Sequence, residues 1–281
     1  MPPPEPIPLA DRVAGLQSRL DAFRRSLEPF AYGAPEPVFM AATQEFLEFV
    51  RTYPDEEAYA EWERGDSTAQ FRAFFAPRVL RFTAAVERQT HAELLAKSGG
   101  RAGGPMGPLL GANRWGAYAR MADILAHLDL AACRTFLMAG CGPVPDSLFC
   151  VHDHTSVERL VGTDRDPLAV GMARQLVNAF GLTRIRIEQA DAGGTDYGDV
   201  DAICCSAFLA PRRAIMERIA STAREGCSII LRDPFFTGTL LFERALDALP
   251  PRLAVVKELP AARSRFMLKY YLLRAGTRST R

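Results

Sequence analysis

The sequence Thr135-Phe-Leu-Met-Ala-Gly-Cys-Gly-Pro-Val-Pro-Asp146 decides the fold of this chain. Its apolar or β-favouring residues Phe136–Ala139 lead into Gly140 and Gly142. This order predicts a buried strand and then a tight loop, whose glycines let a ligand approach the backbone. Two prolines and an amphipathic segment ending near His154 follow, which predicts a helix whose first turn tolerates proline. The stretch therefore predicts a nucleotide-binding turn. Because a Gly-x-Gly pair alone is a weak signal, this interpretation depends on the residues that follow at fixed distances.

After this turn, strand-like and helix-like segments alternate along the chain. Continuous apolar runs such as Ala202–Cys205 indicate strands that are covered on both faces. We therefore expect an α/β fold with a Rossmann-like, doubly wound, mostly parallel sheet, and a ligand at the carboxyl ends of its strands. The last two strands are close in sequence, which predicts an antiparallel hairpin. The predicted strands are 135–139, 159–163, 184–188, 201–206, 228–232, 253–259 and 266–273, and the predicted helices among them are 146–154, 167–179, 211–224 and 239–249.

The first hundred residues have a helical periodicity throughout. Apolar residues at three- and four-residue steps predict helices over 9–27 and 38–50. A longer helix is expected over 71–97, with an N-cap at Asp66-Ser67-Thr68 and a break or kink at Pro77. We therefore predict an N-terminal α-helical cover domain over residues 1–110 and a ligand-binding sheet domain over residues 111–281.

The boundary between these predicted domains is rich in glycine. Six glycines and two prolines lie between Ser98 and Gly111, a density that no regular element accepts. This composition fits a solvated linker, and the alternative is a hinge or lid edge that orders over a ligand. A helix over 114–130 then leads to the first strand.

Composition excludes several classes of function. The chain has 281 residues, with 34 Lys and Arg against 33 Asp and Glu, so no global field attracts nucleic acid or an anionic membrane. No apolar run is long enough to span a bilayer and the start does not resemble a signal peptide, which predicts a cytoplasmic protein. The six cysteines have no metal-ligand spacing with the four histidines, so we assign no metal and expect small buried thiols. Oligomeric state is not predicted.

Polar residues recur where successive predicted strands end. The second strand ends at Asp164, whose carboxylate can accept hydrogen bonds from both hydroxyls of a ribose. The third leads to Asp191, which can accept from an adenine amine, and the fourth leads to Ser206 and Phe208. For either acid the alternative is an ordinary strand-end or surface carboxylate. Three such ends in order favour a nucleoside-containing ligand.

These residues together resemble the class I S-adenosylmethionine-dependent methyltransferases over residues 131–281. The resemblance rests on Gly140-Cys141-Gly142, on Gly162-Thr163-Asp164-Arg165-Asp166-Pro167, on Asp191 and on Val200–Ile203. Dehydrogenases have a third glycine where this chain has Pro145, which disfavours a nicotinamide cofactor. The resemblance implies S-adenosylmethionine as cofactor or co-substrate. The residues expected to bind it are Ala139, Gly140, Cys141, Gly142, Pro143, Asp164, Arg165, Asp191, Ala192, Ser206, Phe208 and Arg232.

A narrower resemblance concerns the prolines of the turn. Gly140-Cys141-Gly142-Pro143-Val144-Pro145 is similar to the Gly-Ser-Gly-Pro-x-Pro turn of nicotianamine synthases and bacterial opine-metallophore synthases. That family implies transfer of the 3-amino-3-carboxypropyl arm of S-adenosylmethionine to a small amino acid or amine, with release of methylthioadenosine. Three alternatives stay open: cyclisation of S-adenosylmethionine to azetidine-2-carboxylate, methyl transfer to a small molecule with release of S-adenosylhomocysteine, and nucleotide binding without catalysis.

For arm transfer an amine must lose a proton, so a carboxylate or tyrosine should face the crevice. The resemblance suggests Glu93, as part of an Ala-Glu pair, and Tyr118, and we add Ser206 as a third catalytic candidate. Glu93 could instead be a solvated helix carboxylate and Tyr118 a packed aromatic. Trp115, Tyr118 and Phe208 are candidates for cation-π contact with the sulfonium. Arg232 could hold the cofactor's carboxylate or pair with Asp233.

Overall fold

The computed structural model describes residues 6–30, 36–65, 67–99, 103–110, 116–260 and 266–277. They form two compact units. The larger unit comprises described residues within 86–233, 244–263 and 268–281, and the smaller comprises those within 1–85, 234–243 and 264–267. Described residues of 86–110, part of the predicted cover domain, lie in the larger unit, and described residues of 234–243 and 264–267 lie in the smaller one.

The larger unit is built on one seven-stranded sheet with the order β3-β2-β1-β4-β5-β7-β6. The pairs from β3 to β5 are parallel, and β6 and β7 form the antiparallel hairpin expected from their short separation. The doubly wound, mostly parallel sheet predicted from the sequence is therefore confirmed. The strands are β1 (Thr135–Ala139), β2 (Arg159–Asp164), β3 (Ile185–Gln189), β4 (Ala202–Cys205), β5 (Ser228–Pro234), β6 (Leu253–Leu259) and β7 (Leu268–Ala275).

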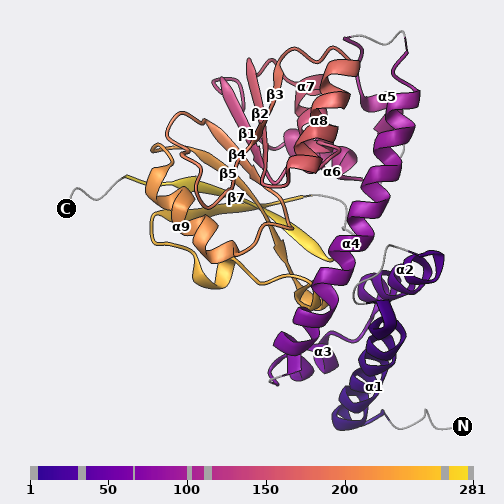
Figure 1. Ribbon diagram of the computed structural model, residues 1–281. Helices are drawn as coiled ribbons and strands as arrows, with labels where there is room; N and C mark the ends of the chain where they lie inside the picture. Colours follow the sequence, from indigo (N-terminus) through magenta and orange to yellow (C-terminus); the bar gives the residue numbers. More distant parts are fainter. Residues whose placement is uncertain are drawn as a thin grey trace, which may run out of the picture. The chain divides into compact units, whose positions relative to one another are not determined.

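Helices cover both faces of this sheet (Figure 1). Successive residues of β1 point to opposite faces, so Phe136 and Met138 join one buried cluster and Leu137 and Ala139 join the other. The first cluster includes α6 (Ala117–Leu125), α7 (Asp146–His154) and α8 (Pro167–Ala179), and the second includes α9 (Arg212–Thr222). All five residues of β1 are buried, as expected for a central strand.

The smaller unit is a helical bundle with an aromatic core. The rings of Phe46 and Phe75 stack with centroids 4.0 Å apart, and Phe23 contacts Phe46 edge-on at 5.4 Å. Its elements are α1 (Leu9–Leu27), η1 (Glu28–Phe30), α2 (Pro37–Thr52), α3 (Glu56–Glu63) and the first part of α4 (Ser67–Ala96), together with η2 (Phe236–Leu240). From Val86 onward, α4 belongs to the larger unit.

Some predicted elements were wrong. Residues 239–249 do not form an α-helix; η2 and η3 (Leu246–Ala248) are short 3-10 turns. In η2, Thr237 donates to the carbonyl of Val50 at 2.6 Å and the Thr239 carbonyl accepts from Arg72 at 2.8 Å, so tertiary contacts override the helical pattern. The break expected at Pro77 does not occur, and the kink given as its alternative stays a prediction.

Other differences concern the ends of helices. α4 runs through Pro77 without interruption, because buried Phe75 and Val79 on either side keep the chain packed. It begins at Ser67, and Asp66 of the predicted N-cap lies outside the described residues. α3 was not predicted, and α6 is shorter than the expected helix over 114–130.

Residues 103–110, within the glycine-rich stretch, are partly packed, with Met106 and Leu110 buried and Gly103, Pro105 and Pro108 exposed. Met106 is fully buried, and the short helix α5 (Gly107–Leu110) follows it. The amide of Gly103 donates to the carbonyl of Phe180 at 2.7 Å. This part of the stretch is therefore docked on the larger unit.

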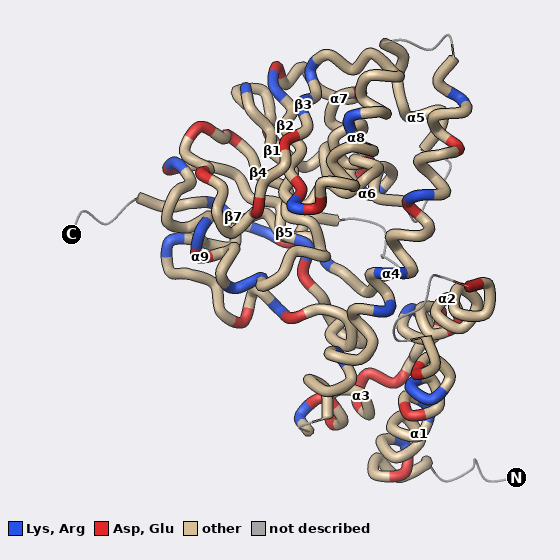
Figure 2. The backbone as a smooth tube through the Cα atoms, in the orientation of Figure 1, with Lys and Arg blue, Asp and Glu red and all other residues tan. Residues whose placement is uncertain are grey.

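Positions of Lys and Arg and of Asp and Glu are interspersed along the backbone, as Figure 2 shows. Across the described ranges, no helix combines the length and the apolar character that crossing a membrane requires. Of the six free cysteines, five are buried and Cys133 is half-buried, close to what the sequence predicted.

Candidate active site

The turn after β1 has the backbone that its glycines predict. Gly140 and Gly142 have φ values of +70° and +66°, a region that favours glycine. A Cβ atom on Gly140 would lie 2.9 Å from Leu209 Cδ2 and 3.0 Å from Ser206 Cβ. The loop that follows β4 can therefore approach the turn this closely only because residue 140 is glycine. The amides of Gly140 and Cys141 both donate to the carbonyl of Thr163, which fixes the turn to the end of β2.

Asp164, the last residue of β2, organises the same turn. Its Oδ2 accepts the amide of Gly142 at 2.9 Å and its Oδ1 accepts the amide of Asp166 at 3.0 Å. Each carboxylate oxygen has two lone-pair sites, so both can still accept from a ligand. Asp164 is half-buried, which leaves it accessible. The structure thus brings the predicted ribose acceptor against the predicted glycine turn.

The sequence analysis missed Glu87, which lies on α4. A Cβ atom on Gly142 would lie 3.4 Å from Glu87 Oε2 and 3.7 Å from Oε1, so this carboxylate faces the turn directly. Burial first, then the charge of Asp164, and to a smaller extent that of Glu87, raise the pKa of the Cys141 thiol. Glu87 lies on the same face of α4 as buried His91 and Leu94, four and seven residues later, but only the fold brings that face to the turn.

The structure does not bring Glu93 to the turn. Its side chain is exposed and accepts a hydrogen bond from Gln89, one turn earlier on α4, at 3.0 Å. This geometry is that of a solvated helix carboxylate, the alternative that the sequence left open. Glu87, six residues before it, is the carboxylate of α4 that faces the turn.

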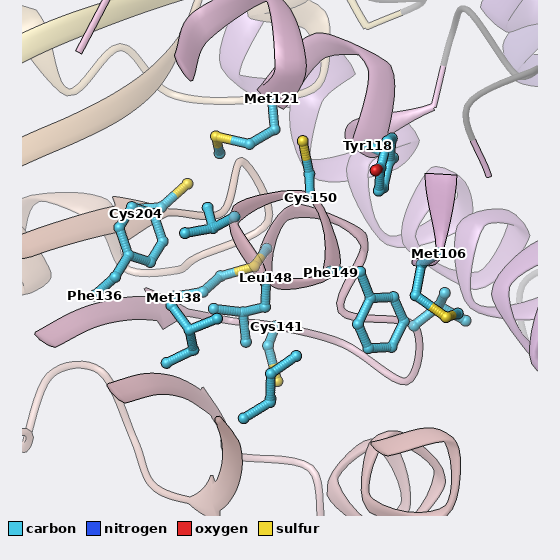
Figure 3. Packing of buried hydrophobic residues seen from close by; sticks show 14 of the residues in the cluster. Met106, Tyr118, Met121, Phe136, Met138, Cys141, Leu148, Phe149, Cys150 and Cys204 are labelled. Atoms are coloured by element: carbon cyan, nitrogen blue, oxygen red, sulfur yellow. The ribbon is translucent and has the colours of Figure 1, made fainter. Parts of the chain in front are cut away.

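Tyr118 also lies away from the turn. Its hydroxyl donates to Asp153 Oδ2 at 2.7 Å and lies 3.2 Å from His154 Nε2. Both partners are in the last turn of α7, whereas Gly140 and Gly142 precede the first. Burial, and then the hydrogen bond to Asp153, raise the pKa of Tyr118 well above its usual range. Figure 3 shows Tyr118 apart from Cys141, with Leu148 and Phe149 of α7 also in the cluster.

Ser206 and Phe208 lie beside the turn, as predicted for the end of β4. The Ser206 amide donates to the carbonyl of Ala139 at 3.0 Å, and its hydroxyl accepts the amide of Phe208 at 3.4 Å. Both residues are half-buried. Trp115, the third aromatic candidate for the sulfonium, lies outside the described residues.

Asp191 and Arg165 are exposed, and their roles stay predictions. The Asp191 carbonyl accepts the amides of Gly194 and Thr195, which closes a turn after β3. Ala192 is buried, and its carbonyl accepts the hydroxyl of Tyr197 at 2.9 Å. Because β3, β2, β1 and β4 are neighbours in the sheet, the residues after their carboxyl ends lie along one edge.

Arg232 is buried and has structural partners. One guanidinium nitrogen donates to Ser147 Oγ at 2.5 Å and lies 3.7 Å from Cys204 Sγ. The alternative pairing with Asp233 is wrong, because Asp233 pairs with Arg212 at 3.0 Å. Arg232 as a ligand for the cofactor's carboxylate stays a prediction.

The part of the chain that the structure describes contains no group of three or more His, Cys, Asp or Glu side chains suited to a metal ion. The polar groups at the turn are two carboxylates, a hydroxyl and backbone amides. Such groups can bind hydroxyls and a cation, and Glu87 can accept a proton.

Comparison with solved structures finds this fold over nearly the whole chain. The structure of MtNAS in complex with MTA and tNA is 14% identical, with 97% of this chain and all of that chain covered and a TM-score of 0.71. A Glu-to-Gln mutant of MtNAS is 15% identical, with 92% and 98% covered and a TM-score of 0.72. The same mutant in complex with S-adenosylmethionine is 14% identical, with 95% of this chain and 98% of that chain covered and a TM-score of 0.67. At these identities the likeness shows the fold alone. No protein-family model and no curated protein matches the sequence.

Proposed function

We propose that this protein is an S-adenosylmethionine-dependent transferase that uses the 3-amino-3-carboxypropyl arm and releases methylthioadenosine. The single observation that carries this proposal is the position of Glu87, whose carboxylate faces Gly142 across the turn. The sulfonium of S-adenosylmethionine is already activated, so the protein must mainly orient the attacking group and remove its proton. Methyl transfer to an acceptor that has no proton to lose would not require such a carboxylate.

The proposed reaction is one displacement. The lone pair of an amine attacks the γ-carbon of the arm, the bond between that carbon and sulfur breaks, and its electron pair stays on sulfur as a neutral thioether. Glu87 accepts the proton that the amine loses. The turn and Asp164 hold the adenosine part, because Asp164 can accept from ribose hydroxyls while it fixes the amide of Gly142.

The comparisons support this proposal through what MtNAS binds. Its structures contain MTA, tNA and S-adenosylmethionine, and this chain has the same fold at low identity. The turn sequence Gly140–Pro145 adds the resemblance to nicotianamine synthases. Two related reactions are the alternatives at the same site: attack by the cofactor's own amine, which closes azetidine-2-carboxylate, and methyl transfer to a small molecule.

Product analysis separates these reactions. The purified protein is incubated with S-adenosylmethionine, with and without a mixture of amino acids, and the nucleoside products are quantified by mass spectrometry. We expect methylthioadenosine above the slow spontaneous rate. Its formation without any acceptor would indicate cyclisation, and S-adenosylhomocysteine as the main product would contradict arm transfer.

A matched pair of variants on α4 tests the assignment of the base. We expect Glu87→Gln to lower kcat by about 10²-fold to 10⁴-fold, the range for loss of a general base, with little change in affinity for S-adenosylmethionine. Glu93→Gln makes the same chemical change on the exposed face and should leave kcat within about twofold, since surface substitutions are usually near neutral. Equal losses in both variants would contradict the role of Glu87.

A further inference from the structure

A buried charged cluster lies under the first turn of α7, directly after the glycine turn. Asp146, the first residue of α7, is three residues after Pro143. Its Oδ1 atom is buried and has no hydrogen-bond partner. The charges of Arg120 and Arg232 both act on it. An acceptor at this position without a partner is costly, so it requires an explanation.

Arg232 has a buried hydrogen-bond donor without an acceptor. Its Nε atom is buried without an acceptor, while its other contacts go to Ser147 and Cys204. The cluster is closed by Tyr270, whose hydroxyl accepts from Arg120 Nε at 2.7 Å and whose ring lies 5.6 Å from the Arg232 guanidinium carbon. One acceptor and one donor therefore lack partners within one cluster.

Several ionisable groups of the described residues surround Asp146. Burial raises the pKa of Asp146 to about 7, and the two arginines limit the rise. The Cys204 thiol is kept neutral by burial, which raises its pKa. Burial likewise raises the pKa of the Cys150 thiol to about 12. The charged or ionisable groups that act on Asp146 or its two arginines are Arg120 on α6, Arg232 on β5, Tyr270 on β7, Cys204 and Cys205 on β4 and Cys150 on α7.

We propose that Asp146 and Arg232 are positioning residues that set the cofactor turn according to the protonation of Asp146. When Asp146 is neutral, Arg232 bonds Ser147 and Cys204, as observed. When Asp146 ionises, its Oδ1 takes the hydrogen bond that Arg232 Nε can donate. The ionised side chain also lies at the N-terminus of α7, where a negative charge is favourable. Because burial nevertheless raises the pKa of Asp146, its ionisation costs free energy in the folded protein, so the first turn of α7, and with it the glycine turn, is then held less firmly.

Charge makes this pair selective between ligands. With Asp146 neutral the cluster contributes two positive charges under the turn, and with Asp146 ionised it contributes one. A ligand with a sulfonium is repelled less in the ionised state, whereas a thioether is not affected. The pair therefore favours S-adenosylmethionine over a product with neutral sulfur once the pH passes about 7. This consequence rests on the proposed function.

The binding experiment compares S-adenosylmethionine with S-adenosylhomocysteine by calorimetry between about pH 5.5 and 8. The two ligands share the same amino-acid head, so titration of that head cancels in the ratio of their affinities. We expect the ratio to rise by about tenfold toward S-adenosylmethionine across this range in the unaltered protein. Asp146→Asn should keep the low-pH ratio throughout, and Asp199→Asn, a matched change of an exposed carboxylate, should behave as the unaltered protein. A rise that survives in Asp146→Asn would overturn the proposal.

A second measurement needs no ligand and separates the two proposals. Hydrogen exchange of the amides in the first turn of α7, corrected for the intrinsic rate at each pH, should become faster by about threefold to tenfold as Asp146 ionises, because ionisation of a carboxyl with a raised pKa favours opening of the turn that buries it. Arg232→Gln should move the midpoint to higher pH, which a merely structural role would not do. If exchange changes with pH in this way but the protein binds neither S-adenosylmethionine nor S-adenosylhomocysteine, the roles of Asp146 and Arg232 are supported and the proposed function is contradicted. An exchange rate that does not change near pH 7 would contradict the proposed role of Asp146 and Arg232.

Discussion

Gly140 shows what a single residue decides in this site. Its φ of +70° and the approach of Leu209 and Ser206 leave no room for a side chain. We expect Gly140→Ala to lower the free energy of unfolding by about 2 to 4 kcal/mol, the sum of left-handed strain and overpacking. Urea titration measures the change.

Gly171 supplies the control for that prediction. It lies exposed in α8, and a Cβ atom there would have no neighbour within 4 Å. Gly171→Ala should therefore stabilise the protein, by about 0.5 to 1 kcal/mol, because glycine is unfavourable inside a helix. A loss of stability at both positions would show that contacts at Gly140 are not the cause.

At the scale of elements, local signals account for what the sequence predicted well. α7 and α8 span the predicted residues 146–154 and 167–179. For α8 the reason is visible: Asp166 accepts the amide of Leu168 at 2.9 Å and Pro167 begins the helix. The glycine turn and Asp164 were predictable in the same way, because they are neighbours of strand ends in sequence.

Contacts between distant residues explain what the sequence did not predict. Residues 239–249 have a helical pattern, but Thr239 is held by Arg72 and by the hydroxyl of Tyr59, far away in sequence. Glu87 was missed for the same reason, since only the fold brings α4 to Gly142. The sequence suggested Glu93 as the base because of a resemblance limited to an Ala-Glu pair. The structure instead favours Glu87, which lies on the face of α4 that packs inward.

Asp153 anchors the segment that contains α5, which the sequence left open as linker or lid. Its Oδ2 accepts the amides of Met106 and Gly107 at 2.7 and 2.9 Å, as well as the Tyr118 hydroxyl. Asp153→Ala leaves three donors without an acceptor and should cost about 2 to 4 kcal/mol of stability, with faster hydrogen exchange over residues 103–110. Tyr118→Phe removes one bond and should cost about 1 kcal/mol.

Enzyme kinetics on Tyr118→Phe decide between its two interpretations. A side chain that only supports Asp153 leaves kcat near that of the unaltered protein while stability falls. A large fall in kcat at unchanged stability would restore the catalytic role that the sequence suggested.

The free energy of unfolding of the whole molecule should depend on pH through the ionisation of Asp146. Burial raises its pKa to about 7 in the folded protein, against about 3.9 for an unfolded chain. A raised carboxyl pKa means that the folded state keeps a proton that the unfolded state loses. Its contribution to stability is therefore complete below about pH 4 and is lost as the pH rises to about 7. The loss is at most roughly 4 kcal/mol, from 1.36 kcal/mol per unit.

Asp146→Asn isolates that contribution, because the amide cannot ionise and all other groups cancel in the difference. Relative to the unaltered protein, the variant should gain stability steadily from about pH 4 to about pH 7 and then stay level. Urea titrations of both proteins at half-unit steps of pH give this difference directly. A difference that is constant with pH would mean that Asp146 is already ionised in the folded protein. The partner that Oδ1 lacks would then have to be Arg232 at every pH, and the affinity ratio of the two sulfur ligands would lose its step as well.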